Sequence, residues 1–344
     1  MKISICIPQY NRINYLLRSL SIIESQSYSN IEIVISDDCS TDDTEARILE
    51  LVTQYRFPII FSKNKKNEGY DRNFRKCIEL ATGEYSLVIG NDDTLYGDES
   101  ISFLVEFLKR NNYPDVGFCN LIEERTDNTL VERANITSVL GSGASVAIKY
   151  YSCFSFVGGL IYRRSNFLKF NTDKYDGSVY TQMYLGVLMI ASGSTLFSIK
   201  EPLVLKDLLL DGKFRNSYRD RIAKKWKDFK IVDGGLPSVM NVLINAMNDA
   251  KTLTQKNTFY IFKRMYLITY PHWILDYKDN KALPEAFGLV LGLLPKKNFN
   301  YGKLTLINKI KINSIYFVST IGALLIPVFL FKKYKSRLYT YFKK

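Results

Sequence analysis

Residues 31–44 read Ile-Glu-Ile-Val-Ile-Ser-Asp-Asp-Cys-Ser-Thr-Asp-Asp-Thr, an apolar run that ends abruptly in carboxylates and hydroxyls. The apolar part, Ile31–Ser36, is short and rich in Ile, which is typical of a strand that is buried on both faces. The polar part, from Asp37 onward, supplies the residue types that favour loops and helix N-termini. This stretch therefore predicts a buried strand, a polar loop and then a helix.

The first hundred residues repeat this alternation of strand and helix. The other predicted strands are Lys2–Pro8, Ile59–Ser62 and Tyr85–Ile89, and the predicted helices are Ile13–Gln26, a segment from the polar cluster through Tyr55, and Arg72–Ala81. This order indicates an α/β fold, in which helices cover both faces of a mostly parallel sheet. Ligands bind such sheets beyond the carboxyl ends of the strands, and every polar cluster of this stretch follows such an end.

The elements that follow are less regular. Helices are predicted at 98–110 and 179–191, strands at 115–120, 156–163 and 196–199, and loops or short strands over 123–150. Beyond about residue 212 the pattern becomes helical and basic. We therefore expect a sheet domain over residues 1–211, a helical basic region over 212–311, and an apolar segment with a basic tail over 312–344.

The charge of the chain is uneven. Residues 1–210 hold 22 Lys and Arg against 26 Asp and Glu, a net charge of −4, whereas residues 211–344 hold 25 against 8, a net charge of +17. A strongly basic half indicates an anionic partner, for which nucleic acid and anionic lipid are the candidates. The sequence has no zinc motif and no nucleic-acid-binding signature, so we expect no nucleic-acid partner.

The scarcity of histidine limits the chemistry. His272 is the one histidine of the sequence, which excludes a Ser-His-Asp triad and a multi-histidine metal site. Acid–base chemistry then falls to carboxylates, and a metal site must be built from oxygen ligands. The five cysteines are widely spaced and form no CxxC pair, which favours free thiols in a reducing compartment. Because the N-terminus does not have the pattern of a signal peptide, we expect the chain to lie in the cytoplasm.

Two adjacent carboxylates, Asp92 and Asp93, follow the apolar run Tyr85–Ile89. Side by side, they would repel each other unless a cation or a hydrogen-bond donor compensates. Mg²⁺ or Mn²⁺ suits them, because these hard ions bind one or two carboxylates together with substrate phosphates. The alternative is an acidic turn before the next helix.

Two further clusters follow strands. An ionised carboxylate only accepts hydrogen bonds, so Asp37 suits the imide N–H of a nucleobase, although a helix cap is the alternative. Between the predicted third strand and third helix, Gly69 permits close backbone approach and Arg72 suits a phosphate. A loop glycine with flanking charges more often marks only a turn.

Taken in order, these residues resemble the family 2 glycosyltransferases with the GT-A fold. The matching motifs are Ile7-Pro8-Gln9-Tyr10-Asn11-Arg12, Val34–Asp42, Asn67-x-Gly69-x-x-x-Asn73, Ala81-Thr82-Gly83-Glu84-Tyr85 and Asn91-Asp92-Asp93. The resemblance weakens toward residue 205 and says nothing of the chain beyond it. It implies an inverting, metal-dependent transfer of a sugar from a nucleotide-diphosphate-sugar to an acceptor hydroxyl, of the kind that builds bacterial surface polysaccharides.

The resemblance also implies roles for individual residues. The turn with Pro8, Tyr10, Asn11 and Arg12 would hold the nucleotide, with Asp37 on the base, and Asn67 and Gly69 would line the same pocket, with Arg72 toward a phosphate. Asp92 and Asp93 resemble the DxD-type element of the family, although its first position is Gly90 or Asn91 here. One of the pair would ligate Mn²⁺ or Mg²⁺ and the other would contact ribose or metal, and the sequence does not separate these roles.

The chain departs from the family where the catalytic base is expected. Family members often carry an acidic pair shortly before a glycine late in the domain, and counting back from Gly193 gives Thr181-Gln182. Glutamine cannot act as a base, and the nearest carboxylate is Asp176. We therefore predict that Asp176 is the base, against the alternative that it begins a Gly-containing turn.

The C-terminal region contains an uncharged stretch of 17 residues, Ile315–Phe331, with Lys309 and Lys311 before it and six Lys and Arg after it. This is the short limit for a spanning helix, and spanning would place those charges against the positive-inside preference. We expect an interfacial or re-entrant segment at an anionic membrane surface, the inner face of the cell membrane. The expected acceptor is a glycan, most naturally a lipid-linked one. The alternative is a buried helix with a solvated basic tail.

Two other functions remain open from the sequence. A nucleotidyltransferase has a similar sheet and acidic metal site, but it is expected to carry a Gly-rich, basic phosphate loop, which Pro8–Arg12 is not. A non-catalytic sugar-nucleotide-binding protein is favoured by Thr181-Gln182, because this pair supplies no base.

Overall fold

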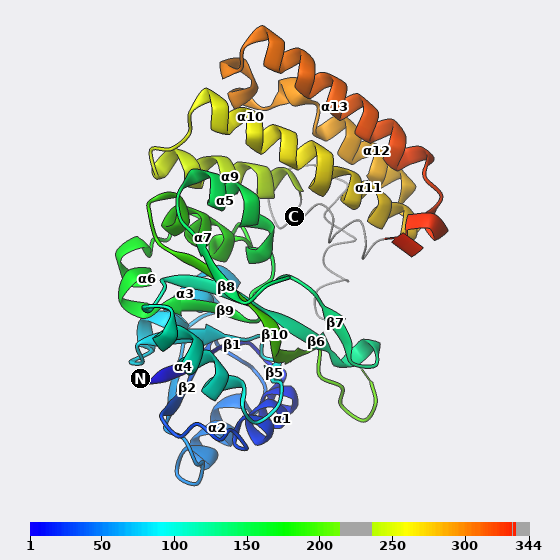
Figure 1. Cartoon of the computed structure of the whole chain (residues 1–344). Coiled ribbons are helices and arrows are strands. Elements are labelled where there is room, and N and C mark those ends of the chain that lie inside the picture. The colour runs from blue at the N-terminus through cyan, green and yellow to red at the C-terminus, as the bar shows by residue number, and fades with distance from the viewer. Residues whose placement is uncertain (214–235, 332, 335–344) are drawn as a thin grey trace. The chain divides into compact units, whose positions relative to one another are not determined.

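The structure is a computed structural model that describes residues 1–213, 236–331, 333 and 334 of the 344-residue chain. Contacts divide the chain into two compact units, residues 1–146 with 150–215 and residues 147–149 with 216–344. The first unit contains the sheet, and the described part of the second is helical (Figure 1).

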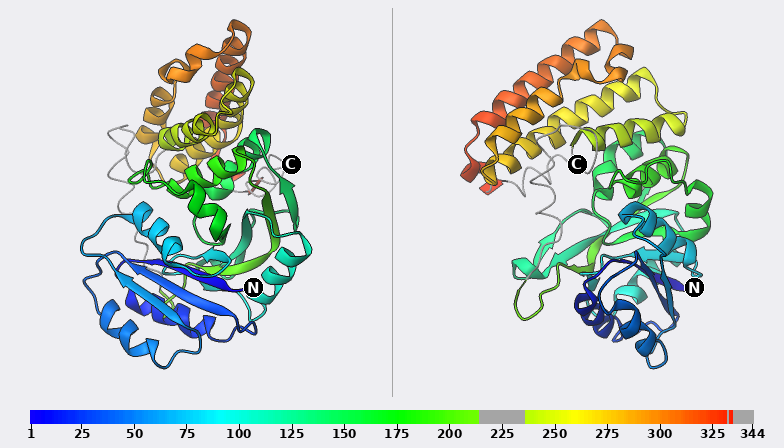
Figure 2. Two further views of the ribbon diagram at one scale, coloured as in Figure 1. Left: turned by 90° about the vertical axis from the view of Figure 1, so that its left-hand side faces the viewer. Right: turned by 180° about the vertical axis from the view of Figure 1, so that it is seen from behind.

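The described residues of the first unit form a ten-stranded mixed sheet (Figure 2). The strands are β1 (Ile3–Gln9), β2 (Ile31–Asp37), β3 (Ile59–Lys63), β4 (Tyr85–Val88), β5 (Thr94–Leu95), β6 (Val116–Glu123), β7 (Thr129–Val131), β8 (Ser138–Gly141), β9 (Leu160–Arg163) and β10 (Leu196–Lys206). Their spatial order is β3-β2-β1-β4-β9-β6-β10-β5, with β7 paired to β6 and β8 paired to β10. The first four strands are parallel, as are β6 and β10, whereas β9 runs antiparallel to both β4 and β6.

Helices cover both faces of this sheet. The helices described in this part of the chain are α1 (Ile13–Ile23), α2 (Thr44–Val52), α3 (Tyr70–Leu80), α4 (Ser100–Arg110), α5 (Ala144–Tyr150), α6 (Arg164–Phe170) and α7 (Thr181–Ala191). Apolar residues of α1 and α4 share one buried cluster with alternate residues of β1 and β2, such as Ile5 and Ile33. On the opposite face α3 packs on β1 and β2, and its Cys77 thiol donates to the Val34 carbonyl. Because both faces are covered, the central strands are buried along nearly their whole length, and this includes polar residues such as Ser4 and Glu32.

The predicted α/β fold is confirmed, and most of the predicted elements lie within a few residues of their expected bounds. The predicted strand 156–163 begins only at Leu160, because Gly158 and Gly159 precede it and Gly159 has a positive φ of 76°. The antiparallel direction of β9 was not predicted, since an apolar run does not report its direction. The two-residue strand β5 was also missed, because two residues carry no periodicity.

The second unit is helical, as expected. Its described helices are α9 (Leu236–Asp249), α10 (Gln255–Arg264), α11 (Tyr270–Asp279), α12 (Leu283–Gly292) and α13 (Leu306–Leu325), and the π-helical segment Met265–Thr269 joins α10 to α11. Three tyrosines form its centre, with ring centroids 5.4 Å apart for Tyr266 and Tyr316 and 5.5 Å apart for Tyr270 and Tyr316. No helix in the described part of the chain combines the length and the apolar character needed to cross a membrane.

Candidate active site

Three polar clusters meet at one edge of the sheet. Strands β2, β1 and β4 are parallel neighbours, so their carboxyl ends lie side by side. Strand β1 leads into residues 9–12, β2 into residues 37–42 and β4 into residues 90–93. This is the edge at which open α/β sheets bind ligands.

The turn after β1 contacts both neighbouring clusters. Pro8 lies in β1 opposite Ser36 of β2. Tyr10 leaves the strand with its side chain 38% exposed, and its carbonyl accepts a hydrogen bond from the Asn91 side-chain amide at 3.4 Å.

Ser40 joins the β2 cluster to this turn. Its main-chain N–H donates to Asp37 Oδ2 at 3.2 Å, and its hydroxyl donates to Asp37 Oδ1. The same hydroxyl accepts the main-chain N–H of Asn11 at 2.7 Å, while Asn11 Oδ1 accepts the N–H of Thr41 at 2.9 Å. Asp37 is fully buried, and this burial raises the pKa of its carboxyl although the bonds from Ser40 act in the opposite direction.

Arg12 joins the same turn to the β4 cluster. Asn11 and Arg12 both adopt the left-handed backbone region, with φ of 54° and 64°, which is uncommon for residues other than glycine. The Gln9 side-chain amide donates to the Asn11 carbonyl and holds the turn. The Arg12 guanidinium forms an ion pair with Asp92 and lies 4.8 Å from the centre of the Tyr15 ring. A continuous chain of contacts therefore runs from Asp37 to Asp92.

The two carboxylates after β4 have different surroundings. The Asp92 side chain is 21% exposed, whereas Asp93 is 1% exposed. Asp93 Oδ2 accepts the N–H of Gly90 at 3.0 Å, and Oδ1 accepts the N–H of Asp207 at 3.1 Å. Burial and the neighbouring charge of Asp92 raise the pKa of Asp93 to about 7. Of the pair, Asp92 is therefore the carboxylate that is open to a ligand.

Gly90, one of the two candidates for the first position of the expected DxD-type element, has little room for a side chain. A Cβ at this position would lie 2.9 Å from Asp93 Oδ2 and 3.1 Å from Asp92 Oδ1. Both carboxylates therefore flank Gly90 closely, and any side chain there would displace them.

Asp92 is the carboxylate of this edge that can share a divalent cation with a bound ligand. Among the residues that the structure describes, no group of three or more His, Cys, Asp or Glu is arranged to hold a metal ion. Mg²⁺ is usually bound through one or two carboxylates, with substrate phosphates and water completing its coordination. Asp92 fits such a site, whereas both oxygens of Asp93 already accept main-chain N–H groups.

Asp38 shapes the loop after β3, a role that the sequence did not predict. Its Oδ1 accepts the Asn64 side-chain amide at 2.9 Å and the N–H of Glu68 at 2.8 Å, and its Oδ2 accepts the N–H of Gly69 at 2.9 Å. Asp37 instead accepts the N–H and the hydroxyl of Ser40, so the two adjacent carboxylates hold different loops. In the sequence, the only sign of this second role was that Asp38 stands directly beside Asp37.

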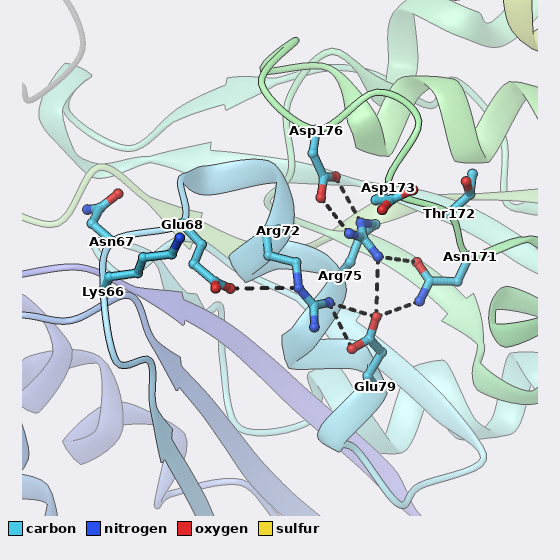
Figure 3. A pocket seen from close by; sticks show the side chains of 10 residues that line it. All are labelled: Lys66, Asn67, Glu68, Arg72, Arg75, Glu79, Asn171, Thr172, Asp173 and Asp176. Carbon is cyan, nitrogen blue, oxygen red and sulfur yellow. Dashed lines mark hydrogen bonds and ion pairs between the residues drawn. The ribbon is translucent and has the colours of Figure 1, made fainter.

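A cavity of about 800 Å³ opens between the loop after β3, α3 and the segment after α6 (Figure 3). It is lined by Lys66, Asn67, Glu68, Arg72, Arg75, Glu79, Asn171, Thr172, Asp173 and Asp176. Three predicted site residues, Asn67, Arg72 and Asp176, line this cavity, whereas Asp37, Asp92 and Asp93 do not. The structure thus groups the predicted residues into two sets, and the loop held by Asp38 belongs to the second.

Asp176 is tied to α3 by Arg75 (Figure 3). Arg75 Nε donates to Asp176 Oδ1 at 2.9 Å, and the second guanidinium nitrogen pairs with Oδ2. Arg75 also pairs with Glu79, which in turn pairs with Arg72. Arg72 extends to Glu68 as well. Sequence reasoning missed this network, since its members come from α3 and from a segment about a hundred residues later.

Thr181 and Gln182 begin α7 and are buried. The carboxylate of Asp71 accepts the main-chain N–H of Val179 at 2.7 Å and that of Thr181 at 3.2 Å. Burial raises the pKa of Asp71 to about 6, against the effect of these bonds. The Gln182 side chain lies inside the protein, at the position where the family resemblance led us to expect an acid.

Comparisons with known proteins give the family of the chain. The profile of "Glycosyl transferase family 2" matches residues 4–182, more than half of the chain. The abequosyltransferase RfbV of Salmonella typhimurium is 33% identical over 225 residues, which cover 60% of this chain and 66% of that protein. The GalNAc(5)-diNAcBac-PP-undecaprenol beta-1,3-glucosyltransferase of Campylobacter jejuni is 30% identical over 95 residues, 27% of this chain and 30% of that protein. This chain thus spans less than two thirds of the length of either relative.

A likeness to a solved structure extends further along the chain. S. aureus TarS 1–349, in its crystal structure in complex with UDP-GlcNAc, matches 94% of this chain and 91% of its own with a TM-score of 0.52 and 17% sequence identity. At that identity the likeness is one of fold. Since the family profile covers more than half of its length, the chain belongs to glycosyl transferase family 2.

Proposed function

We propose that the chain is a glycosyltransferase that moves a sugar from a nucleotide-diphosphate-sugar to an acceptor hydroxyl in polysaccharide synthesis. The observation that carries this proposal is the chain of contacts from Asp37 through Ser40 and Asn11 to the Arg12–Asp92 ion pair. It joins three clusters at the ligand-binding edge of the sheet. The names of the relatives, an abequosyltransferase and a glucosyltransferase, support the same activity.

The nucleotide would occupy the edge formed by the Pro8–Arg12 turn and Asp37. A carboxylate offers about four lone-pair sites. Ser40 uses two of those of Asp37, and because this carboxylate is fully buried, a nucleobase N–H would reach it only after the Ser40 loop shifts. The exposed ring of Tyr10 is available to the nucleoside, and the loop with Asn67 and Gly69 would line the far side of the donor, toward Arg72.

Asp92 would hold a divalent cation, Mn²⁺ or Mg²⁺, against the donor diphosphate. A bound cation offsets the charge that develops on the leaving diphosphate. Arg12 would orient the Asp92 carboxylate and add positive charge at the same edge. Asp93, held by the N–H groups of Gly90 and Asp207, would fix the backbone from which Asp92 projects.

Asp176 would act as the base in a single inverting displacement. It lines the cavity together with Asn67 and Arg72, and its side chain is 22% exposed, so an acceptor hydroxyl can approach it. Arg75 takes two of the lone-pair sites of this carboxylate, which leaves capacity for the proton of the acceptor hydroxyl. Glu79 already pairs with Arg75 and offers the guanidinium a second carboxylate.

The acceptor would be a glycan, most naturally a lipid-linked one. The name of the Campylobacter jejuni relative specifies an undecaprenol-linked glycan, which supports this class of acceptor.

A second candidate function is a non-catalytic sugar-nucleotide-binding protein. Two observations favour it: buried Thr181 and Gln182 take the place of the acidic pair, and Arg75 engages both oxygens of Asp176.

Thermal-shift measurements with a panel of nucleotide sugars, with and without Mn²⁺, test these proposals, followed by assays of donor hydrolysis and transfer. We expect one donor to raise the melting temperature, more so with Mn²⁺, and Asp92→Asn to lose the Mn²⁺-dependent part. Binding without hydrolysis or transfer would favour the second candidate. If no nucleotide sugar stabilises the protein, both candidates are refuted.

A further inference from the structure

The outer face of α13 is apolar and open to solvent. Its inner face buries Ile312, Tyr316 and Ala323 within the second unit. The opposite face carries Ile307, Ile310, Phe317, Val318, Ile321 and Leu325, each between 41% and 76% exposed. At the rise of an α-helix this row extends for roughly 27 Å. A row of large apolar side chains of this length is more than the scattered exposure that is normal on a protein surface.

The neighbouring helix α12 carries a second such row. Leu283, Phe287 and Leu291 follow one another at the spacing of one helix face and are 47%, 50% and 62% exposed. The two helices are in contact, since the Tyr316 hydroxyl of α13 donates to the Val290 carbonyl of α12 at 2.7 Å. They also lie side by side in Figures 1 and 2.

The charged residues in the sequence around these rows are almost all positive. Residues 281–334 contain eight lysines and a single acidic residue, Glu285. Lys303, Lys309 and Lys311 lie at the start of α13, and Lys333 lies beyond its end, so lysines stand at both ends of the apolar row. Two copies of this surface facing each other would bring like charges together. An anionic partner with an apolar interior matches both features.

We propose that the outer faces of α12 and α13 form a docking surface for a bilayer that contains anionic phospholipid, with α13 lying along the interface. The apolar row would enter the boundary between headgroups and acyl chains, while the lysines would contact lipid phosphates. The helix would lie on the membrane and not cross it, in keeping with Lys309 and Lys311 in its first turns. This inference goes beyond the proposed function, because docking requires neither donor nor acceptor.

The difference from the sequence prediction lies in which residues take part. The sequence indicated the uncharged stretch 315–331, whereas the exposed row begins at Ile307, in the first turn of α13, and has a companion on α12. The buried Tyr316 and Ala323 of that stretch belong to the core of the second unit.

Flotation of the full-length protein with vesicles tests the proposal. Vesicles of phosphatidylcholine alone are compared with vesicles that also contain phosphatidylglycerol, at low and at high salt. We expect flotation with the anionic vesicles, weakened by salt. The triple variant Phe317→Ser, Ile321→Ser, Leu325→Ser should lower the partition coefficient at least about tenfold. Lys303→Gln with Lys311→Gln, at two exposed lysines, should reduce the preference for anionic vesicles.

A matched control replaces three apolar residues that are equally exposed in the first unit. These are Leu49, Leu130 and Ile136, which are 57%, 50% and 51% exposed, and their change to serine should leave flotation unaltered. Circular dichroism and donor-induced thermal shifts establish that each variant is folded, and the single variants Phe317→Ser and Leu325→Ser replace the triple one if it does not fold.

Three results would overturn the proposal. The first is a folded wild-type protein that does not float with anionic vesicles. The second is equal flotation of the wild type and the folded triple or single variants. The third is a protein that does not bind vesicles but forms a dimer by light scattering, with the dimer abolished by the α13 substitutions. That result would make this face an interface between two copies. Because donor binding is measured separately, none of these results bears on the proposed transferase activity.

Discussion

Replacing Asp176 with Asn distinguishes a catalytic base from a residue that only positions the segment after α6. Asp176 is 22% exposed and Arg75 is 6% exposed, and two hydrogen bonds join them. Asn retains one acceptor but removes the charge, so a nearly buried guanidinium loses a charge-assisted partner. We expect the free energy of unfolding to fall by about 1.5–3 kcal/mol.

The expected effect on activity is larger. A positioned general base contributes roughly 10²–10⁴ in rate, which corresponds to about 3–5 kcal/mol of activation free energy. If Asp176 is the base, kcat at saturating donor and acceptor should fall at least about 100-fold. KM for the donor should change little, because donor binding is assigned to other residues. Steady-state rates and urea unfolding of the same preparations measure the two effects.

Arg75→Lys is the matched control. It keeps the positive charge but loses the two-point geometry. It should lower stability by a similar amount while leaving the Asp176 carboxylate in place, so kcat should fall less than about tenfold. Asp173→Asn removes another carboxylate of the same cavity and should leave kcat within a few-fold. If Asp176→Asn and Arg75→Lys reduce kcat equally, Asp176 acts only by positioning, and if Asp176→Asn retains its kcat, it is not the base.

Three further outcomes follow from other parts of the first unit. Burial raises the pKa of Glu32, but hydrogen bonds from its neighbours outweigh this effect and lower the pKa to about 2. The Glu32 carboxylate therefore stabilises the fold fully above the unfolded pKa of about 4.5, and this stabilisation is lost as the pH falls toward 2. Glu32→Gln should cost about 3 kcal/mol at neutral pH and flatten the acid limb of urea unfolding, and parallel pH curves would contradict this. Asp38→Asn should loosen the loop that includes Gly69 and weaken nucleotide binding about tenfold by calorimetry, and an unchanged affinity would exclude that loop from the donor site. Gly117→Ala would place a Cβ 2.4 Å from the Phe197 ring and should lower the free energy of unfolding by about 1–3 kcal/mol in chemical denaturation. An unchanged midpoint would show instead that the ring has room to move.

The sequence predicted the sheet well because its central strands are covered on both faces. Such strands read as continuous apolar runs, of which Ile31–Ser36 is the clearest. It could not predict that β9 runs antiparallel, since the direction of a strand depends on how the preceding connection crosses the sheet. It could not predict β5 either, since two residues show no hydrophobic periodicity. It also could not separate the two faces of α13, because both are apolar and differ only in whether another helix covers them.

The candidate site was predicted in part for a similar reason. Polar residues that follow a strand are visible in the sequence, so the clusters after β1, β2 and β4 were found. Their pairings were not, because Arg12 and Asp92 lie 80 positions apart and Arg75 and Asp176 lie 101 apart. The different surroundings of Asp92 and Asp93 likewise depend on the main-chain N–H of Asp207, which comes from the end of the sheet domain.

In the proposed site, Asp37 and Asp92 would bind one nucleoside diphosphate, Asp37 at its base and Asp92 through a cation at its diphosphate. Titration calorimetry of nucleoside diphosphates into the full-length protein, with and without Mn²⁺, directly tests this arrangement. We predict that Mn²⁺ raises the affinity of the wild type at least about tenfold and that Asp92→Asn abolishes this gain. Asp37→Asn should weaken binding both with and without the metal. Diphosphate binding that ignores Mn²⁺ and is unchanged by both substitutions would contradict the assignment.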